Sequence, residues 1–202
     1  MAVANYVDER GHFPPAFLAN GSGQALLSWR VLLLPYINGN ELYKQFDLNE
    51  SWDSPTNVRL LKQMPSVYRL HTIADDNHTA ANYVAVVGDE TVWGGVEGRP
   101  VDFVTDSRSN TLLIAEFVGH PIPWTKPEDL LFAEMDMTVD SDSGICSVLT
   151  PPAYVSVDGL VQHLPQKTDK ATVRALLTAQ GGEPPGHFPT TSDGRLRPRK
   201  PG

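Results

Sequence analysis

Three aspartates between residues 136 and 142 form the most suggestive set of potential ligands in the sequence. Asp136, Asp140 and Asp142 lie within one short segment, and Ca²⁺ favours clustered carboxylate oxygens. Residues 140–144 resemble the front of an EF-hand loop, but the glycine comes one position early and the twelfth position is Pro151, which supplies no ligand. The segment therefore leaves two interpretations open, a calcium site or an acidic surface loop, and predicts no other metal.

The histidines and the single cysteine do not form a catalytic or zinc-binding pattern. No two of the six histidines stand at helical metal-ligand spacing, although a loop site made by His71 and His78 stays open beside the simpler interpretation of a solvated pair. Cys146 is the only cysteine, which excludes an internal disulfide, and we expect it in the core. A glycine-rich phosphate loop and a Gly-x-Ser-x-Gly nucleophile elbow are also missing. We therefore predict no catalytic residues, no enzyme, and no cofactor other than calcium.

Four tryptophans and one glutamate remain as candidates for binding. The tryptophans either line a sugar or peptide groove or anchor short helices onto a sheet, and the second is the simpler interpretation; they are Trp29, Trp52, Trp93 and Trp124. Glu116 ends an apolar run and is expected to be buried. A buried carboxylate marks a site, pairs with an arginine, here Arg30 or Arg108, or caps a loop.

Composition limits the class of protein. The chain has 202 residues and a formal net charge of -8, which argues against a nucleic-acid-binding surface. The one basic stretch, residues 195–200, either contacts anionic lipid or polysaccharide or, more simply, is a solvated tail. No apolar run approaches the roughly 20 residues that cross a bilayer, and the first residues lack the features of a secretory signal. As written, the sequence predicts a soluble chain of one domain or a small two-part domain.

The first half of the chain is predicted to hold three short helices. Ser28 is a plausible N-cap for a helix over residues 29–34, which Pro35 ends or kinks. Asn40 is expected to cap a second short helix with an apolar face. A third begins near Pro55 and ends before residues 64–65.

The second half is predicted to form an antiparallel sheet with a covering helix. Residues 81–87 and 111–117 are β-rich, and the second run is expected to be the central strand. Residues 91–93 are a candidate partner strand, and residues 125–130 have the order of a helix start. Asp158 and Gly159 between alternating apolar residues predict a tight type I′ hairpin. Thr168 is expected to cap the last helix, through Leu177. This order is α+β.

Several of these blocks resemble the DUF1559 family, also called SBP_bac_10. The matching stretches, in family order, are GHFPP at 11–15, LSWRVLLLPY at 27–36, LYKQF at 42–46, WDSP at 52–55, NYVAVVG at 82–88 and PWTKPEDL at 123–130. Members are prepilin-like, with a cleavable leader and a long apolar helix before a sheet-bearing head, and they carry an H-x9-DG element. One naming tradition groups the family with solute-binding proteins, and its activity is not established.

The resemblance implies a domain plan with specific departures. Residues 1–10 would be a truncated remnant of the N-terminal helix region, residues 11–182 a pilin-like globular head, and residues 183–202 a disordered, Pro/Gly-rich basic tail. Asp158 and Gly159 would be the DG of the family element, but the position of its histidine is taken by Val148. Any role that needs this histidine is in doubt, whereas the hairpin is not.

The resemblance also sets the functional expectation. It implies a non-catalytic, pseudopilin-like protein of the cell envelope, related to type II secretion components and acting in assembly or surface interaction. Its partners would be other pilin-like subunits or envelope components, and it would meet the membrane only through the missing N-terminal helix. The alternative is an extracytoplasmic binding module for a small solute or calcium.

Overall fold

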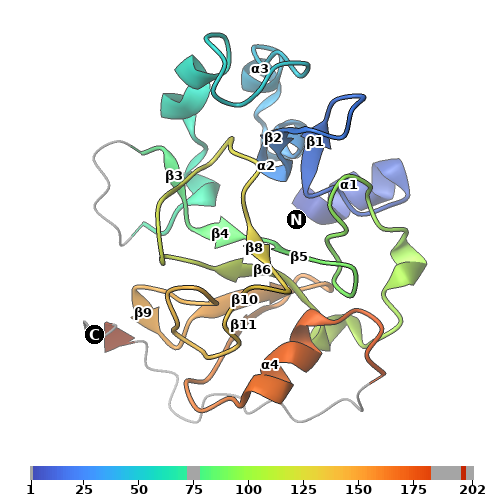
Figure 1. Cartoon of the computed structure of the whole chain (residues 1–202), viewed down its shortest axis with the longest axis vertical. Helices are drawn as coiled ribbons and strands as arrows, with labels where there is room; N and C mark the ends of the chain where they lie inside the picture. The colour runs from blue at the N-terminus through green and yellow to red at the C-terminus, as the bar shows by residue number, and fades with distance from the viewer. Residues whose placement is uncertain (1, 72–77, 183–196, 199–202) are drawn as a thin grey trace. The chain divides into compact units, whose positions relative to one another are not determined.

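The computed structural model describes residues 2–71, 78–182 and 197–198, and its fold is α+β, as predicted (Figure 1). The chain forms two compact units. Unit 1 combines Met1–Asn82, Trp93–Val101 and Pro121–Asp129, and unit 2 combines Tyr83–Val92, Asp102–His120 and Leu130–Gly202. Each unit is therefore assembled from segments that are distant in the sequence.

Short helices and two-stranded pairs make up unit 1. Its elements are α1 (Ala2–Arg10), β1 (Phe17–Ala19), β2 (Ala25–Ser28), α2 (Trp29–Leu32), η1 (Leu34–Ile37), α3 (Asn40–Tyr43), η2 (Val58–Gln63), η3 (Ser66–Tyr68), β3 (Ala80–Ala81) and β7 (Ile122–Pro123), where η denotes a 3₁₀ helix. β1 pairs antiparallel with β2, and β3 pairs antiparallel with β7.

The predicted cap at Ser28 and the break at Pro35 are confirmed in unit 1, whereas the cap predicted at Asn40 is wrong. The Ser28 side chain accepts a hydrogen bond from the Arg30 backbone N–H and starts α2. The predicted helix over residues 29–34 is split, because Pro35 occupies the first turn of η1 rather than continuing α2. η2 ends before Met64, as predicted, and Gly39 rather than Asn40 is the residue before α3.

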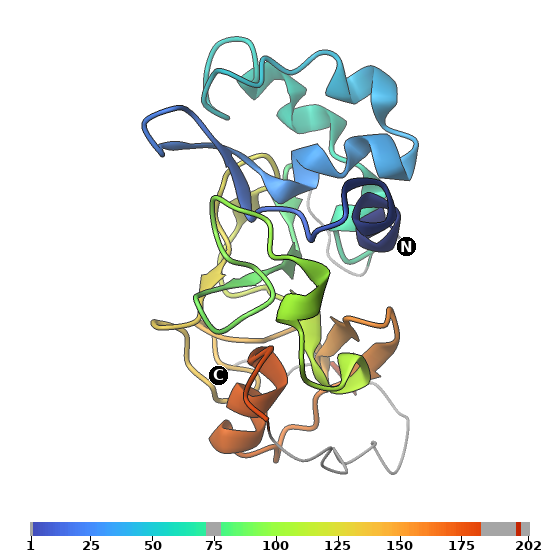
Figure 2. The same ribbon diagram turned by 90° about the vertical axis from the view of Figure 1, so that its right-hand side faces the viewer.

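Helix α1 and the β1–β2 hairpin are elements that the sequence did not predict. α1 buries Val3 and Tyr6 and lies against η1, where the rings of Tyr6 and Tyr36 meet edge to face at 5.4 Å (Figures 1 and 2). The helix has only nine residues, so its stability depends on this packing rather than on local propensity.

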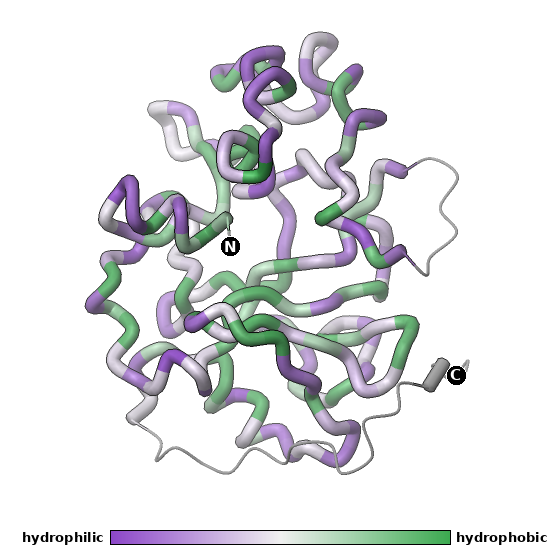
Figure 3. Tube along the Cα trace, turned by 180° about the vertical axis from the view of Figure 1, so that it is seen from behind, coloured by the Kyte–Doolittle hydropathy of each residue, from purple (hydrophilic) through white to green (hydrophobic). Residues whose placement is uncertain are grey.

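A four-stranded antiparallel sheet is the main feature of unit 2. The strands run in the order β11 (Val161–His163), β10 (Ala153–Ser156), β6 (Leu112–Glu116) and β4 (Tyr83–Val84). β6 is an inner strand and is almost wholly buried, which confirms the prediction that the apolar run is central. Figure 3 shows hydrophobic stretches in the region of this sheet, although β11 carries hydrophilic residues.

The remaining elements of unit 2 are helices and two short strand pairs that are separate from this sheet. They are β5 (Val86–Val87), η5 (Arg108–Asn110), β8 (Leu130–Leu131), β9 (Leu149–Thr150), α4 (Lys170–Leu177) and β12 (Arg197–Pro198), and η4 (Val101–Phe103) spans a junction between the units. β5 pairs parallel with β8, and β9 pairs antiparallel with β12. α4 is capped by Asp169, not by the predicted Thr168, since the Asp169 carboxylate accepts a hydrogen bond from the Thr172 N–H.

The strand predicted over residues 81–87 is broken into three pieces. β3, β4 and β5 pair with β7, β6 and β8 respectively. The predicted partner strand at residues 91–93 is reduced to an isolated bridge between Thr91 and Thr178. A near-continuous apolar run therefore pairs with three different strands. The spacing of its apolar residues does not predict this division.

The helix start predicted at Thr125 is wrong, because these residues form turns. The Thr125 carbonyl accepts a hydrogen bond from the Ser28 N–H, and the Lys126 N–H bonds to the Pro123 carbonyl. The Asp129 carboxylate, which would have favoured a helix N-terminus, is engaged with α2 instead. Tertiary contacts have overridden the local signal.

The predicted hairpin is present, but with a different turn. Tyr154 of β10 pairs with Gln162 of β11, and the Ser156 N–H bonds to the Leu160 carbonyl at 3.0 Å. Only Gly159 has a positive φ, of 88°, so Asp158 does not adopt the type I′ conformation. The loop has three residues and closes on a left-handed glycine.

The last two observations concern membrane-spanning helices and the C-terminal tail. No helix among the residues that the structure describes is long and apolar enough to cross a membrane. The predicted disordered tail, residues 183–202, lies outside the described residues except for β12.

Candidate functional site

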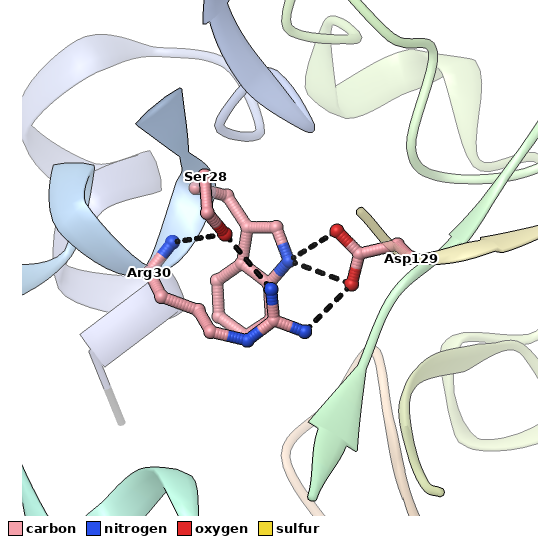
Figure 4. Close-up of polar contacts among 4 residues, drawn as sticks. Ser28, Arg30 and Asp129 are labelled. Carbon is pink, nitrogen blue, oxygen red and sulfur yellow. Dashed lines mark hydrogen bonds and ion pairs between the residues drawn. The ribbon is translucent and has the colours of Figure 1, made fainter. Parts of the chain in front are cut away.

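The Ser-Trp-Arg block of the sequence forms a buried polar cluster in unit 1 (Figure 4). Arg30 Nη2 donates to Asp129 Oδ1 at 2.8 Å, and its Nη1 donates to Ser28 Oγ at 2.8 Å. The indole Nε1 of Trp29 donates to Asp129 Oδ2 at 3.1 Å. One carboxylate thus binds two neighbouring side chains of α2.

This cluster is closed to solvent. The side chains of Arg30 and Asp129 are 0% and 3% exposed, and the guanidinium carbon lies 4.6 Å from the centre of the Trp29 ring. The Tyr68 hydroxyl donates to the Arg30 carbonyl at 2.8 Å, and burial raises the pKa of Tyr68. Buried charges are stable only when they are paired and hydrogen-bonded, so the cluster fixes the fold of unit 1 rather than offering a binding site.

Three of the four tryptophans belong to the core of unit 1. Trp29, Trp93 and Trp124 are at most 1% exposed, and the rings of Trp29 and Trp93 lie 5.1 Å apart. Trp52 is half-buried, with the Lys126 ammonium 5.9 Å from its ring centre. The structure thus supports their anchoring role over an aromatic binding groove.

The acidic segment of unit 2 uses its carboxylates internally. Asp136 Oδ1 accepts from the Thr138 N–H at 2.9 Å and from Lys170 Nζ at 3.0 Å, and the Thr138 bond is the main cause of its lowered pKa. Asp140 Oδ2 accepts from Thr150 Oγ1 at 2.8 Å and from Gln166 Nε2. Among residues 2–71 and 78–182, no group of three His, Cys, Asp or Glu side chains is placed to hold a metal, so Asp136, Asp140 and Asp142 are not gathered into one site.

The other candidates have ordinary structural roles. Cys146 is fully buried, and its Sγ accepts a weak hydrogen bond from the Val118 N–H. His78 contacts the Arg69 guanidinium, while residues 72–77 between the two histidines lie outside the described part of the chain. Val148, at the position where the resemblance would place a histidine, is half-buried just before β9.

Glu116 is buried, as predicted, and its partner is a backbone amide rather than an arginine. Its Oε2 accepts from the Ala153 N–H of β10 at 2.8 Å, and its side chain is on the same sheet face as that of its β4 partner Tyr83. On the other side, Ala153 pairs with His163 of β11. The pKa of Tyr83 is raised by burial and then by the Glu116 charge.

The sheet thus brings Tyr83, Glu116 and His163 into one row that sequence reasoning missed. The three residues come from β4, β6 and β11, and the small side chain of Ala153 lies between the last two. Their place in one row depends on strand order and register, and no spacing in the sequence announces it.

The most exposed apolar side chains of the described residues lie at the hairpin. Val161 is 68% exposed and Leu160 is 58% exposed. The turn between β10 and β11 is held by Asp158, whose Oδ1 accepts from the Ser156 hydroxyl at 2.6 Å. Asp158 and Gly159 therefore shape a hairpin that presents apolar groups to solvent.

One comparison with known proteins gave a match. Residues 1–73 match the SBP_bac_10 family, described as a protein of unknown function (DUF1559). No curated protein and no solved structure matches the chain. The matched region contains α1, α2 and the Arg30 side of the buried cluster.

Proposed function

We propose that this chain, a member of the DUF1559 family by the match of its residues 1–73, is a non-catalytic, pseudopilin-like protein of the cell envelope that acts through protein–protein contacts. Its partners would be other pilin-like subunits or envelope components. The family resemblance supports the envelope location, and the distribution of polar and apolar groups supports the mode of action.

The single observation that carries the proposal is that polar groups are buried in the Ser-Trp-Arg block while apolar side chains are exposed at the hairpin. The polar groups of the Ser-Trp-Arg block are buried and bonded to one another, so no substrate reaches them. Leu160 and Val161 are instead more than half exposed. These two adjacent apolar side chains on a defined hairpin are thus available for contact with a partner protein.

The proposal is tested by photo-crosslinking in the organism that encodes the chain. A photoreactive amino acid is placed at Leu160, with a matched control at Val67, an apolar side chain of similar exposure in unit 1. We expect adducts with envelope proteins from position 160 and few from position 67, in the envelope fraction. Equal labelling at both positions, or recovery of the protein in the cytoplasmic fraction, would contradict the proposal.

A second candidate function, binding of a small solute, is favoured by the row of Tyr83, Glu116 and His163. Glu116 supplies a buried acceptor and the other two residues supply polar groups from half-buried positions. We expect a thermal shift with a cationic or hydroxylated solute that is lost in Glu116→Gln. Calcium is the less favoured ligand, because Asp136 and Asp140 already accept hydrogen bonds within the protein; a calcium-induced shift that disappears in Asp140→Ala would reverse that preference.

A further inference from the structure

Strand β11 is the outer strand of the four-stranded sheet of unit 2, with β10 on one side only. Two hydrogen bonds fix which of its residues face β10: the Ser156 N–H bonds to the Leu160 carbonyl, and the Leu164 N–H bonds to the Pro152 carbonyl at 2.8 Å. Inward and outward groups alternate along an antiparallel strand. The N–H and C=O groups of Val161 and His163 therefore point away from β10.

This edge is short, with three residues in β11, but it lacks the charged side chains and prolines that also protect outer strands. β11 contains no proline and no lysine, and its sequence between residues 160 and 164 has no acidic or basic side chain other than histidine. Within the residues of unit 2 that the structure describes, no strand pairs with its outer side. Val161, at 68% exposure, adds an apolar side chain to this edge.

We propose that β11 pairs antiparallel with β11 of a second copy of this chain, so that the two sheets join across a two-fold axis at Gln162. This deepens, and depends on, the proposed role in protein–protein contacts. The axis places Val161 opposite His163 of the second copy, and the outward backbone groups of these residues then satisfy one another in hydrogen-bonded pairs. The same patch meets itself, as a two-fold interface requires.

Charge at the two ends of the hairpin favours the antiparallel direction. Asp158 is exposed beyond the start of β11, and Lys167 is exposed beyond its end. Antiparallel pairing brings the Asp158 end of one copy toward the Lys167 end of the other. Parallel pairing would place the two Asp158 carboxylates at the same end, where like charges repel.

The first test is the concentration dependence of the full chain in analytical ultracentrifugation. We expect wild type to pass from monomer to dimer as concentration rises. Val161→Lys should weaken the dimer at least about tenfold, because it puts a charge on the pairing edge. Val67→Lys is the matched control, since it makes the same change at an exposed valine in unit 1, and it should leave the dimer unchanged.

The second test reads the register directly. Under mild oxidation, a mixture of Val161→Cys and His163→Cys proteins should give disulfide-linked dimers, whereas either variant alone should give few, because only residues 161 and 163 are directly opposed. The native Cys146 is buried and should not compete. Circular dichroism of each variant checks that the sheet is retained.

The outcomes separate this inference from the proposed function. Wild type that stays monomeric at every concentration, or equal cross-linking by each cysteine variant alone, overturns the β11 pairing. An added extended peptide that binds the edge of a monomeric protein also overturns it. If photo-adducts from position 160 with another envelope protein persist in either case, the interaction role stands without the self-pairing.

Discussion

The Arg30 cluster of unit 1 and the β10–β11 hairpin of unit 2 differ in which side chains they bury: the first buries charged groups, and the second exposes apolar groups. In the first, a guanidinium and a carboxylate are buried and bonded to each other. In the second, Leu160 and Val161 are exposed although both are apolar. The comparison shows that residue type alone does not tell where a side chain lies; what matters is whether partners for it exist in the fold.

The difference has an energetic meaning. A buried ion pair that loses one member leaves a charge without a partner in a medium of low dielectric, which is costly. An exposed apolar side chain contributes little to folding, so its replacement should change the free energy of unfolding only slightly. All four tryptophans belong to unit 1, so their fluorescence reports on this unit selectively.

The largest effect is expected for Asp129→Ala. This change leaves the Arg30 guanidinium buried without its carboxylate, and it should lower the free energy of unfolding of unit 1 by about 3–5 kcal/mol. Urea unfolding followed by tryptophan fluorescence measures the loss. Glu41→Ala is the control within the same unit, because it breaks a Lys44 pair whose side chains are more than half exposed, and it should cost less than about 1 kcal/mol. Similar losses in the two variants would remove the distinction between buried and exposed pairs.

Glu116→Ala tests whether removal of a buried acceptor in unit 2 lowers the free energy of unfolding, as removal of Asp129 is expected to do in unit 1. The variant leaves the Ala153 N–H without the oxygen that lies 2.8 Å away, and a loss of about 1.5–3 kcal/mol is expected. Unfolding is followed by far-UV circular dichroism. Glu116→Gln keeps an oxygen acceptor and should lose less; if both variants lose the same amount, the charge rather than the hydrogen bond is responsible.

Gly159→Ala tests the turn that presents the exposed hairpin. Gly159 has a φ of 88°, a conformation that costs a residue with a Cβ roughly 1–2 kcal/mol. Thermal unfolding by circular dichroism measures the effect. Leu160→Ala, at the neighbouring exposed position, should change stability by less than about 0.5 kcal/mol.

Asp136→Asn gives a pH-dependent effect in unit 2. The hydrogen bonds from Thr138 and Lys170 lower the pKa of Asp136 in the folded state, so its ionised form stabilises the protein above the unfolded pKa of about 4. This stabilisation is lost as the pH falls below about 4 toward the folded pKa. Wild type should therefore exceed the variant in stability at pH 7, by a margin that shrinks in acid. Urea midpoints across pH 2–7, a range of about five units, measure it.

Lys170→Met is the matched variant for this pH effect. Thr138 provides the leading contribution to the lowered pKa, and Lys170 follows it. The lysine variant should therefore show the same sign of change with a smaller amplitude. A larger amplitude than that of Asp136→Asn would mean that the hydrogen bond from Thr138 does not dominate.

The smallest effect on stability is expected for Val161→Lys. Val161 is 68% exposed, so its replacement should change the free energy of unfolding by less than about 0.5 kcal/mol. Circular dichroism during urea unfolding checks this at low protein concentration, where association is weakest. A loss above about 1 kcal/mol would show that Val161 packs within unit 2, and the contrast between a buried charged cluster and an exposed apolar hairpin would not hold.

Local signals in the sequence predicted a large part of the fold. The Ser28 cap, the Pro35 break, the central apolar strand and the hairpin at Gly159 all depend on neighbouring residues, and each is confirmed. The prediction was wrong at residues 125–130, where Asp129 leaves the expected helix start to bond with Arg30. It also missed α1, whose stability comes from packing against η1.

The α+β class, the Ser28 cap, the Pro35 break, the hairpin at Gly159 and the family resemblance that residues 1–73 bear out could all be predicted from the sequence. Only the tertiary structure decided that Arg30 binds Asp129, 99 residues away, that one apolar run serves three partner strands, and that β11 is an outer strand. The physical reason is range. Caps and turns are set by interactions within a few residues, whereas ion pairing, strand order and exposure depend on which distant segments the fold brings together.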